Sequence, residues 1–234
     1  MTPYLFVLWN VYRVEERVNP YLFVLWNMHS LEEIMKILVL ADEESKLLYD
    51  HFKPGMLDDI ELILACGDLH ASYLSFLVTM SHATVLYIHG NHDHYEKDAM
   101  NGCICVDDDI FVYKGIRILG LGGSMRYHPE ADHQFSEKEM GRRIRRLWWK
   151  IFRHRGFDIL MTHAPAYHLN DMEDLPHRGF AAFLRLMEKY KPRFFIHGHI
   201  HATYGSCFKR LDHYKETTVV NAYEKYIIEY PDEN

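Results

Sequence analysis

Tyr87-Ile88-His89-Gly90-Asn91-His92-Asp93-His94 joins the end of an apolar run to a dense polar cluster. A largely apolar run, residues 83–88, leads into it and predicts a buried strand. The chain then breaks at Gly90 and presents an amide, an imidazole and a carboxylate in succession. Burying such groups at the end of a strand costs free energy unless they have partners. Alone, the stretch fits a functional site and a polar histidine-containing loop equally well, so the surrounding sequence must decide.

Length and composition indicate an ordinary globular chain. At 234 residues, with 48% hydrophobic residues, it suits one domain, or one domain plus an appendage. The net charge of -7 does not indicate nucleic acid or an anionic membrane as a partner of the whole molecule. The four cysteines show neither a secreted disulfide framework nor a paired zinc pattern, which predicts reduced thiols and a cytoplasmic protein. No apolar run approaches the roughly 20 residues that span a bilayer.

The N-terminus holds an internal repeat. Residues 3–10, PYLFVLWN, recur identically as residues 20–27. Two copies are too few for a solenoid, which needs about three units to bury a shared core. The apolar runs are also too short for a secretory signal. We expect residues 1–34 to be an extension outside a catalytic domain at 35–234, with a docking or membrane-surface role as the weaker alternative.

Beyond the extension, strands and helices alternate. The pattern predicts strands at 37–40, 60–65 and 84–88, with helices at 45–52 and 71–80 between them. This order is typical of parallel strands joined by right-handed crossovers. In such sheets the binding groups gather at the carboxyl ends of the strands.

The second half continues with strands and two long helices. We expect strands at 110–113, 116–121, 158–161 and 193–196, a closing pair of strands at 217–221 and 225–229, and helices at about 136–155 and 180–191.

The helix at 136–155 has an apolar face and a basic face. The apolar positions are Ile144, Leu147, Trp148, Ile151 and Phe152; the basic ones are Arg142, Arg143, Arg145, Arg146, Lys150 and Arg153. Basic residues interleaved with aromatic ones can bind nucleic acid. A solvated face over a packed apolar face is the commoner arrangement, and it is our expectation here.

Metal-ligand residues follow five of the expected strands. They are Asp42 with Glu44, Asp68, Asn91 with His92, His163, and His199 with His201. Pairs at i and i+2 point the same way in an extended segment, so both members can reach one site. Carboxylate, amide and imidazole together suit Mn²⁺, Zn²⁺ or Fe²⁺. This is too many ligands for one tetrahedral ion, but it suits two ions that share a carboxylate.

These motifs, in this order, resemble the calcineurin-like metallophosphoesterase superfamily. The resemblance rests on Asp42-x-Glu44, Gly67-Asp68, Gly90-Asn91-His92-Asp93, His163 and Gly198-His199-x-His201, and it covers about residues 35–205. It implies an α/β fold, a β-sandwich of two mixed sheets flanked by helices. It also implies a phosphatase or phosphodiesterase that hydrolyses phosphomonoesters or phosphodiesters with two divalent metal ions, which activate a water for attack on the phosphate.

The resemblance also assigns roles. Asp68 would bridge the two ions. Asp42 and His201 would bind the first ion, with Glu44 at the family's usual histidine position. Asn91, His163 and His199 would bind the second ion. His92, oriented by Asp93, would face the phosphate and stabilise its charge or protonate the leaving oxygen.

Glu44 departs from the family pattern, which has histidine there. Glutamate is a competent oxygen ligand that adds negative charge, so we expect Mn²⁺ most, or Mg²⁺, with iron or zinc as alternatives. In the other interpretation Glu44 points away and the first ion is weakly held.

Substrate-binding candidates are Arg126, His177 and Arg178, although structural ion pairs or exposed loop positions are equally good interpretations of the two arginines. We expect supporting roles beside the ligands for His70, His89, His94 and His197. The expected partner is a small phosphorylated substrate, not a membrane, and the sequence does not indicate the oligomeric state. The alternatives are a nuclease, and a scaffold like the retromer subunit of this fold. Such scaffolds typically lack the motif histidine, which is present here as His92.

Overall fold

The computed structural model describes residues 34–95 and 100–231. The chain divides into two units, Met1–Met35 with Glu229–Asn234, and Lys36–Ile228. The predicted extension with its repeat lies outside the described residues, apart from Ile34. Within the described part, no helix is long and apolar enough to cross a membrane.

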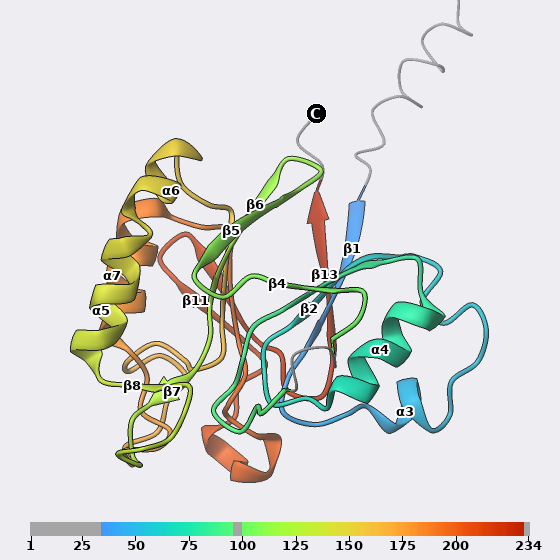
Figure 1. The fold of residues 1–234 in the computed structure, drawn as a ribbon, viewed down its shortest axis with the longest axis horizontal. Coiled ribbons are helices and arrows are strands. Elements are labelled where there is room, and N and C mark those ends of the chain that lie inside the picture. The colour runs from blue at the N-terminus through green and yellow to red at the C-terminus, as the bar shows by residue number, and fades with distance from the viewer. Residues whose placement is uncertain (1–33, 96–99, 232–234) are drawn as a thin grey trace, which may run out of the picture. The chain divides into compact units, whose positions relative to one another are not determined.

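Two β-sheets form the centre of the fold (Figure 1). The first sheet has the order β13-β1-β2-β3-β4 and the second has the order β11-β12-β10-β9-β6-β5. The first sheet comprises β1 (Ile34–Leu40), β2 (Ile60–Ala65), β3 (Thr84–Tyr87), β4 (Cys103–Cys105) and β13 (Tyr226–Pro231). The second comprises β5 (Asp109–Tyr113), β6 (Ile116–Leu121), β9 (Ile159–Thr162), β10 (Phe194–His197), β11 (Leu211–Tyr214) and β12 (Thr217–Asn221). A small pair, β7 (Ser124–Met125) and β8 (Gln134–Phe135), lies apart from both sheets.

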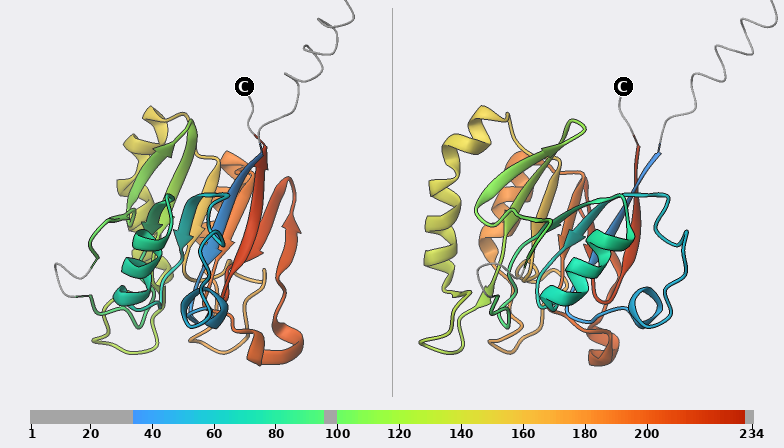
Figure 2. Two further views of the ribbon diagram at one scale, coloured as in Figure 1. Left: turned by 90° about the vertical axis from the view of Figure 1, so that its right-hand side faces the viewer. Right: turned by 45° about the vertical axis from the view of Figure 1, so that its right-hand side comes forward.

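Helices flank the sheets on both outer sides (Figures 1 and 2). Next to the first sheet are α3 (Lys46–Tyr49) and α4 (Ala71–Met80). Next to the second are α5 (Glu137–Arg146), α6 (Trp148–Arg153) and α7 (Ala181–Tyr190), and a 3₁₀ segment, η1 (Ala202–Cys207), follows β10. The expected sandwich of two sheets between helices is therefore confirmed.

The strands that lead to the ligand motifs run parallel within each sheet. β1, β2 and β3 pair in parallel in the first sheet, as β6, β9, β10 and β12 do in the second. Their carboxyl ends therefore lie at one edge of each sheet, which is where the ligand motifs begin.

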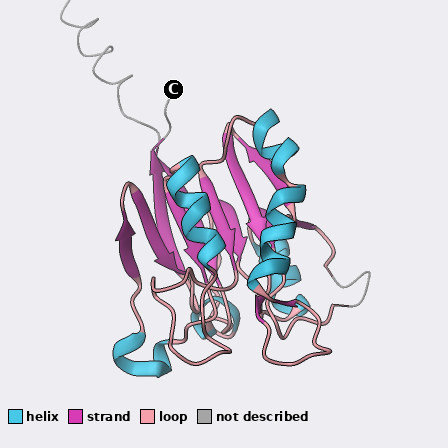
Figure 3. Ribbon diagram, turned by 90° about the vertical axis from the view of Figure 1, so that its left-hand side faces the viewer, coloured by secondary structure: helices cyan, strands magenta, loops and turns pink. Residues whose placement is uncertain are grey.

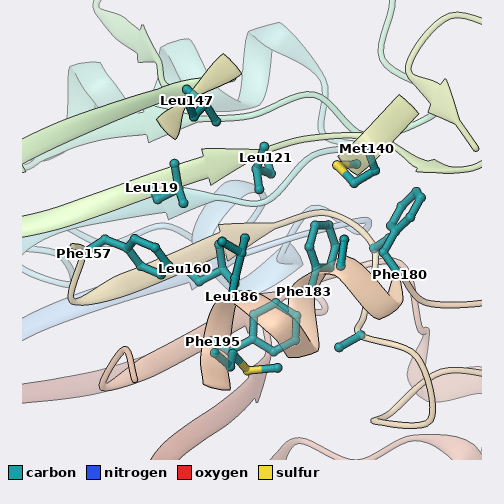
Figure 4. Close-up of a cluster of buried hydrophobic side chains, with 14 of the residues drawn as sticks. Leu119, Leu121, Met140, Leu147, Phe157, Leu160, Phe180, Phe183, Leu186 and Phe195 are labelled. Atoms are coloured by element: carbon teal, nitrogen blue, oxygen red, sulfur yellow. The ribbon is translucent and has the colours of Figure 1, made fainter. Parts of the chain in front are cut away.

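Each sheet buries one apolar face under its helices. In the second sheet, Leu119, Leu160 and Phe195 pack with Phe183 and Leu186 of α7 (Figure 4). Figure 3 shows α7 and the α5–α6 pair lying over these strands. Burying a side chain of this size contributes about 1.5–3 kcal/mol, so this layer holds the ligand-bearing strands firmly.

The prediction that the last two strands pair with each other is wrong. β12 lies in the second sheet between β10 and β11, whereas β13 lies beside β1 in the first sheet. The connecting residues cross from one sheet to the other: the Ala222 N–H donates to the carbonyl of His197, and the Glu224 N–H to that of Ala41. β4 and β11 were not expected at all.

Two helices also differ from expectation. The expected helix at 45–52 is the single turn α3. The helix expected at 136–155 is two helices that meet at Leu147. Leu147 and Ile151 are buried as expected, but Trp148 and Phe152 are 57% and 64% exposed and stack on each other. Trp149 joins the same exposed aromatic group, so these side chains pack on one another instead of entering the core.

An ion pair between Arg117 and Asp158 joins the starts of β6 and β9. The Arg117 Nε–H donates to Asp158 Oδ2 at 2.8 Å, and Nη2 to Oδ1 at 2.5 Å. Burial alone would raise the pKa of Asp158, but the hydrogen bonds from Arg117 hold it below its ordinary value of 3.8.

We expect Asp158→Asn to lower the free energy of unfolding by about 1–2 kcal/mol at pH 7. Since the folded-state pKa is depressed, this contribution is present above the ordinary pKa and is lost as the pH falls through the folded-state pKa. Urea unfolding should therefore show a smaller difference in the free energy of unfolding between the variant and the wild type at pH 3 than at pH 7. The exposed pair Lys36–Asp59 gives a control, Asp59→Asn, expected to cost less than about 1 kcal/mol. A deficit that persisted in acid would contradict the electrostatic explanation.

Candidate active site

The ligand motifs meet at a cleft with a volume of about 700 Å³. The residues that line it include Asp42, Asp68, His92, His199, His201 and Tyr204. They come from loops at the carboxyl ends of strands in both sheets, so the sandwich brings together motifs that are far apart in sequence.

Four predicted ligand atoms converge beside this cleft. His163 Nε2 lies 3.1 Å from Asn91 Oδ1, 3.1 Å from His199 Nδ1 and 3.3 Å from Asp68 Oδ2. Asn91, His163 and His199 are buried, and the Asp68 side chain is 10% exposed. One carboxylate oxygen, one amide oxygen and two imidazole nitrogens thus face a common point, which is a donor set for a divalent transition metal.

Backbone carbonyls orient both imidazoles in this group. His163 Nδ1 lies 2.8 Å from the carbonyl oxygen of Cys66, and His199 Nε2 lies 2.9 Å from that of Pro176. Because a carbonyl only accepts, each of these nitrogens carries a proton, and the other nitrogen is the one that faces the common point. This is the arrangement that prepares histidine to bind a metal.

The pKa shifts in this group indicate that it favours a positive charge at its centre. Burial alone would lower the pKa of His163, but the Asp68 carboxylate raises it to about 10. Burial alone would raise the pKa of Asp68, but His163 and the His92 N–H bring it well below its ordinary value. Burial, followed by the neighbouring His163, lowers the pKa of His199 to about 3. A cation at the common point would satisfy Asp68 in place of the His163 proton, so these residues fit a metal ion.

The predicted ligands of the first ion are brought together in part. Asp42 accepts the His199 N–H through both carboxylate oxygens, at 3.0 and 2.8 Å, and His201 Nε2 lies 3.6 Å from Asp42 Oδ1. Glu44 does not line the main cleft but lies with Asp42 and Asp68 in a neighbouring hollow. In the part of the chain that the structure describes, Glu44 Oε1 is buried without a hydrogen-bond partner. That oxygen is free to act as a ligand.

Glycine allows the ligand loops to approach closely. A Cβ on Gly67 would lie 2.3 Å from the nitrogen of Gly90, and a Cβ on Gly90 would lie 2.0 Å from Asp68 Oδ1. The glycine in each motif therefore leaves room for the backbone or the ligand of the other loop.

Asp93 fastens these two loops together. Its Oδ2 accepts the N–H of Gly90 at 2.7 Å and that of Asp68 at 2.8 Å. His92 donates its own N–H to Asp68 Oδ1 at 2.8 Å, while its side chain is exposed and lines the cleft. The orientation of the His92 ring by Asp93 stays a prediction, because these hydrogen bonds of Asp93 are to backbone groups.

Three of the ligand residues have left-handed backbone conformations. The φ angles are 66° at Asp42, 56° at Asp68 and 68° at His199. Non-glycine residues rarely adopt this region, and such conformations cluster at functional sites.

The three substrate-binding candidates lie in different places. His177 lines the cleft and hydrogen-bonds with Asp174. The Arg126 side chain donates to the carbonyl of Gln134 and pairs with Glu139, and Arg178 donates to the carbonyl of Glu173. Neither arginine lines the cleft, so their contacts match the structural interpretation.

The sequence pattern missed two tyrosines. The hydroxyl of Tyr127 accepts from Asn91 Nδ2 at 3.2 Å, which turns Oδ1 of that amide to the common point. The Tyr204 ring stacks on His201 at 5.1 Å between centroids, and its hydroxyl lies 3.2 Å from His177 Nε2. Tyr204 follows His201 by three residues, but only a known 3₁₀ turn at η1 would have indicated the contact.

Comparison with known proteins gives one family and several related folds. A family model described as calcineurin-like phosphoesterase matches residues 26–203. The crystal structure of TT1561 of Thermus thermophilus matches 82% of this chain and 90% of its own, with 16% identity and a TM-score of 0.55. Another solved structure matches 84% of this chain and 95% of its own, with 11% identity and a TM-score of 0.60. These identities support a shared fold alone, and no curated protein matches the chain.

Proposed function

The chain belongs to the calcineurin-like phosphoesterase family, and we propose that it hydrolyses phosphate esters with the help of two divalent metal ions. The observation that carries the proposal is the convergence of Asp68, Asn91, His163 and His199 on one point, with one nitrogen of each imidazole directed inward by a backbone carbonyl at the other. A scaffold that binds no metal would not need this orientation.

The proposal assigns a role to each predicted metal-binding and catalytic residue. Asp68, Asn91, His163 and His199 would hold one ion, and Asp42, Asp68, His201 and Glu44 the other. When bound, such a pair supplies Lewis-acid polarisation of the phosphoryl oxygens and a water of lowered pKa. His92, exposed in the cleft, would donate a hydrogen bond to the phosphate or a proton to the leaving oxygen. Asp93 holds the Asp68 and Gly90 loops in position for this.

The proposed substrate is a small phosphorylated molecule in the cytoplasm. A nuclease is less well supported, because α6, which carries part of the basic face, lies at the opposite end of the strands from η1 and its cleft residue Tyr204 (Figure 1). A nucleic acid held by α6 would therefore lie away from the cleft.

Hydrolysis of aryl phosphate monoesters and diesters with added Mn²⁺ tests the proposal. We expect turnover that is abolished by a chelator and restored by Mn²⁺. A panel of cyclic nucleotides, phosphorylated metabolites, DNA and RNA would then define the substrate class. Metal binding without hydrolysis of any ester would favour the scaffold, and hydrolysis of nucleic acid alone would favour the nuclease.

Glu44 should set the preference for the metal. Because its carboxylate adds negative charge where the family has an imidazole, we expect Mn²⁺ or Mg²⁺ to support activity better than Zn²⁺. Glu44→His should shift this preference toward Zn²⁺, which activity profiles with each metal would show. Glu43→His, which changes the neighbouring acid, is the control. Identical profiles for Glu44→His and the wild type would show that Glu44 does not bind the ion.

A further inference from the structure

A second group of metal-ligand side chains lies outside the cleft. It consists of His89, just beyond β3, Cys105 at the end of β4, and Asp107 two residues further on. One ligand atom of each lies within 4.8 Å of the others. None of the three lines the cleft. Imidazole, thiol and carboxylate together are typical of sites for zinc and similar ions.

The imidazole of this group is already oriented. His89 Nδ1 lies 2.5 Å from Asp107 Oδ2, so Nε2 is left as the ligand atom. The Asp107 carboxylate is itself fixed, because Oδ2 accepts the His89 N–H at 3.0 Å and Oδ1 accepts the Gly122 N–H at 2.6 Å. A carboxylate that fixes one ring nitrogen while the other binds the ion is a recurring arrangement around zinc.

A second imidazole packs on the first. The ring of His133 stacks on that of His89, with 4.4 Å between centroids and an interplanar angle of 3°. Because the two rings are parallel, their lone pairs lie in separate planes, so His133 holds the His89 ring in place and is not itself a ligand.

A purely structural role would explain only part of this arrangement. The hydrogen bonds of Asp107 fasten the end of β3 to Gly122, which follows β6, and this needs only His89 and Asp107. It gives no reason for the exposed thiol of Cys105 to converge on the same imidazole, with which it hydrogen-bonds. An oriented imidazole, a carboxylate and a thiol at one place are better explained as ligands.

We propose that Cys105 and His89, held by Asp107, form a third metal site that binds zinc or a similar thiolate-preferring ion. The ion would connect the end of β4 with the loop that follows β3. This site does not depend on the proposed hydrolase activity, because it shares no ligand with the cleft.

Cobalt binding can test the site selectively, because only a sulfur ligand gives a thiolate-to-cobalt charge-transfer band in the near ultraviolet. The proposed ligands in the cleft are carboxylate, amide and imidazole groups, which cannot produce this band. We expect metal-stripped, full-length protein titrated with Co²⁺ to show the band and Cys105→Ser to lose it, together with one bound ion per chain. Cys103→Ser, on the same strand, is the matched control and should keep both.

A further variant separates this proposal from the proposed function. Asp68→Asn should lose metal from the cleft but keep the charge-transfer band. The third site would be refuted by the absence of the band in the wild type, or by its survival in Cys105→Ser, which would assign it to another thiol. Circular dichroism of each variant establishes that it is folded, and Cys105 is exposed, so its replacement by serine is expected to be tolerated.

Discussion

Replacement of Asp68 by asparagine is expected to lower kcat/KM for aryl phosphates by about a thousandfold or more, since metal-ion catalysis contributes several kcal/mol and each 1.36 kcal/mol is a factor of ten. Asp68 belongs to the converging ligand group and also lines the cleft. The variant exchanges a charged oxygen for a neutral amide of the same shape. Metal content and kinetics with saturating Mn²⁺ measure the effect.

The fold should survive this substitution. An asparagine Oδ1 can still accept the His92 N–H that Asp68 accepts at 2.8 Å, so the loop keeps its hydrogen bond. Asp109→Asn, which changes an exposed acid paired with Lys150, is the control and should keep full activity. Near-normal activity with two bound ions in Asp68→Asn would refute the bridging role.

Replacement of His92 by alanine is expected to lower kcat by about 10²–10⁴-fold while metal binding is unchanged, as for loss of a general acid. The ring lines the cleft, whereas its backbone N–H holds Asp68, and only the ring is removed by alanine. His82→Ala, an exposed histidine beyond α4, is the control. Equal rates for His92→Ala and the wild type would overturn the proposed role.

The leaving group separates the two roles proposed for His92. If the ring protonates the leaving oxygen, the loss should be much larger for alkyl esters, whose leaving groups need a proton, than for nitrophenyl esters. If the ring only stabilises phosphoryl charge, the loss should be similar for both. A series of esters with leaving groups of different pKa measures this directly.

The sequence predicted the strands that lead to ligands better than the closing segment. Residues 60–65 and 84–88 are apolar runs that end in ligand motifs. The apolar pattern predicts a strand, and the motif after it predicts that this strand ends at the site, so the two signals agree. The run at 225–229 looks equally like half of a hairpin. Its placement beside β1 depends on Tyr223 and Glu224 reaching Ala41, a contact that no local pattern contains.

The site was predictable where the residue type has few common roles at the end of a strand. Histidine and aspartate after a strand suggest a metal directly, and the structure brings Asp68, Asn91, His163 and His199 together. Arginine has many uses, and the contacts of Arg126 with Gln134 and Glu139 depend on the β7–β8 pair, which has no clear sequence signal. Tyrosines 127 and 204 were missed for the same reason.

The left-handed backbone at Asp42, Asp68 and His199 has a consequence for laboratory evolution. Each such conformation costs up to about 1–3 kcal/mol, and glycine would relieve it. A library screened only for heat resistance therefore has no reason to keep the ligand side chains at these positions, and can return stable proteins that bind no ion. A thermostable version of this chain has to be selected for turnover in the same round, or improved at positions away from these loops.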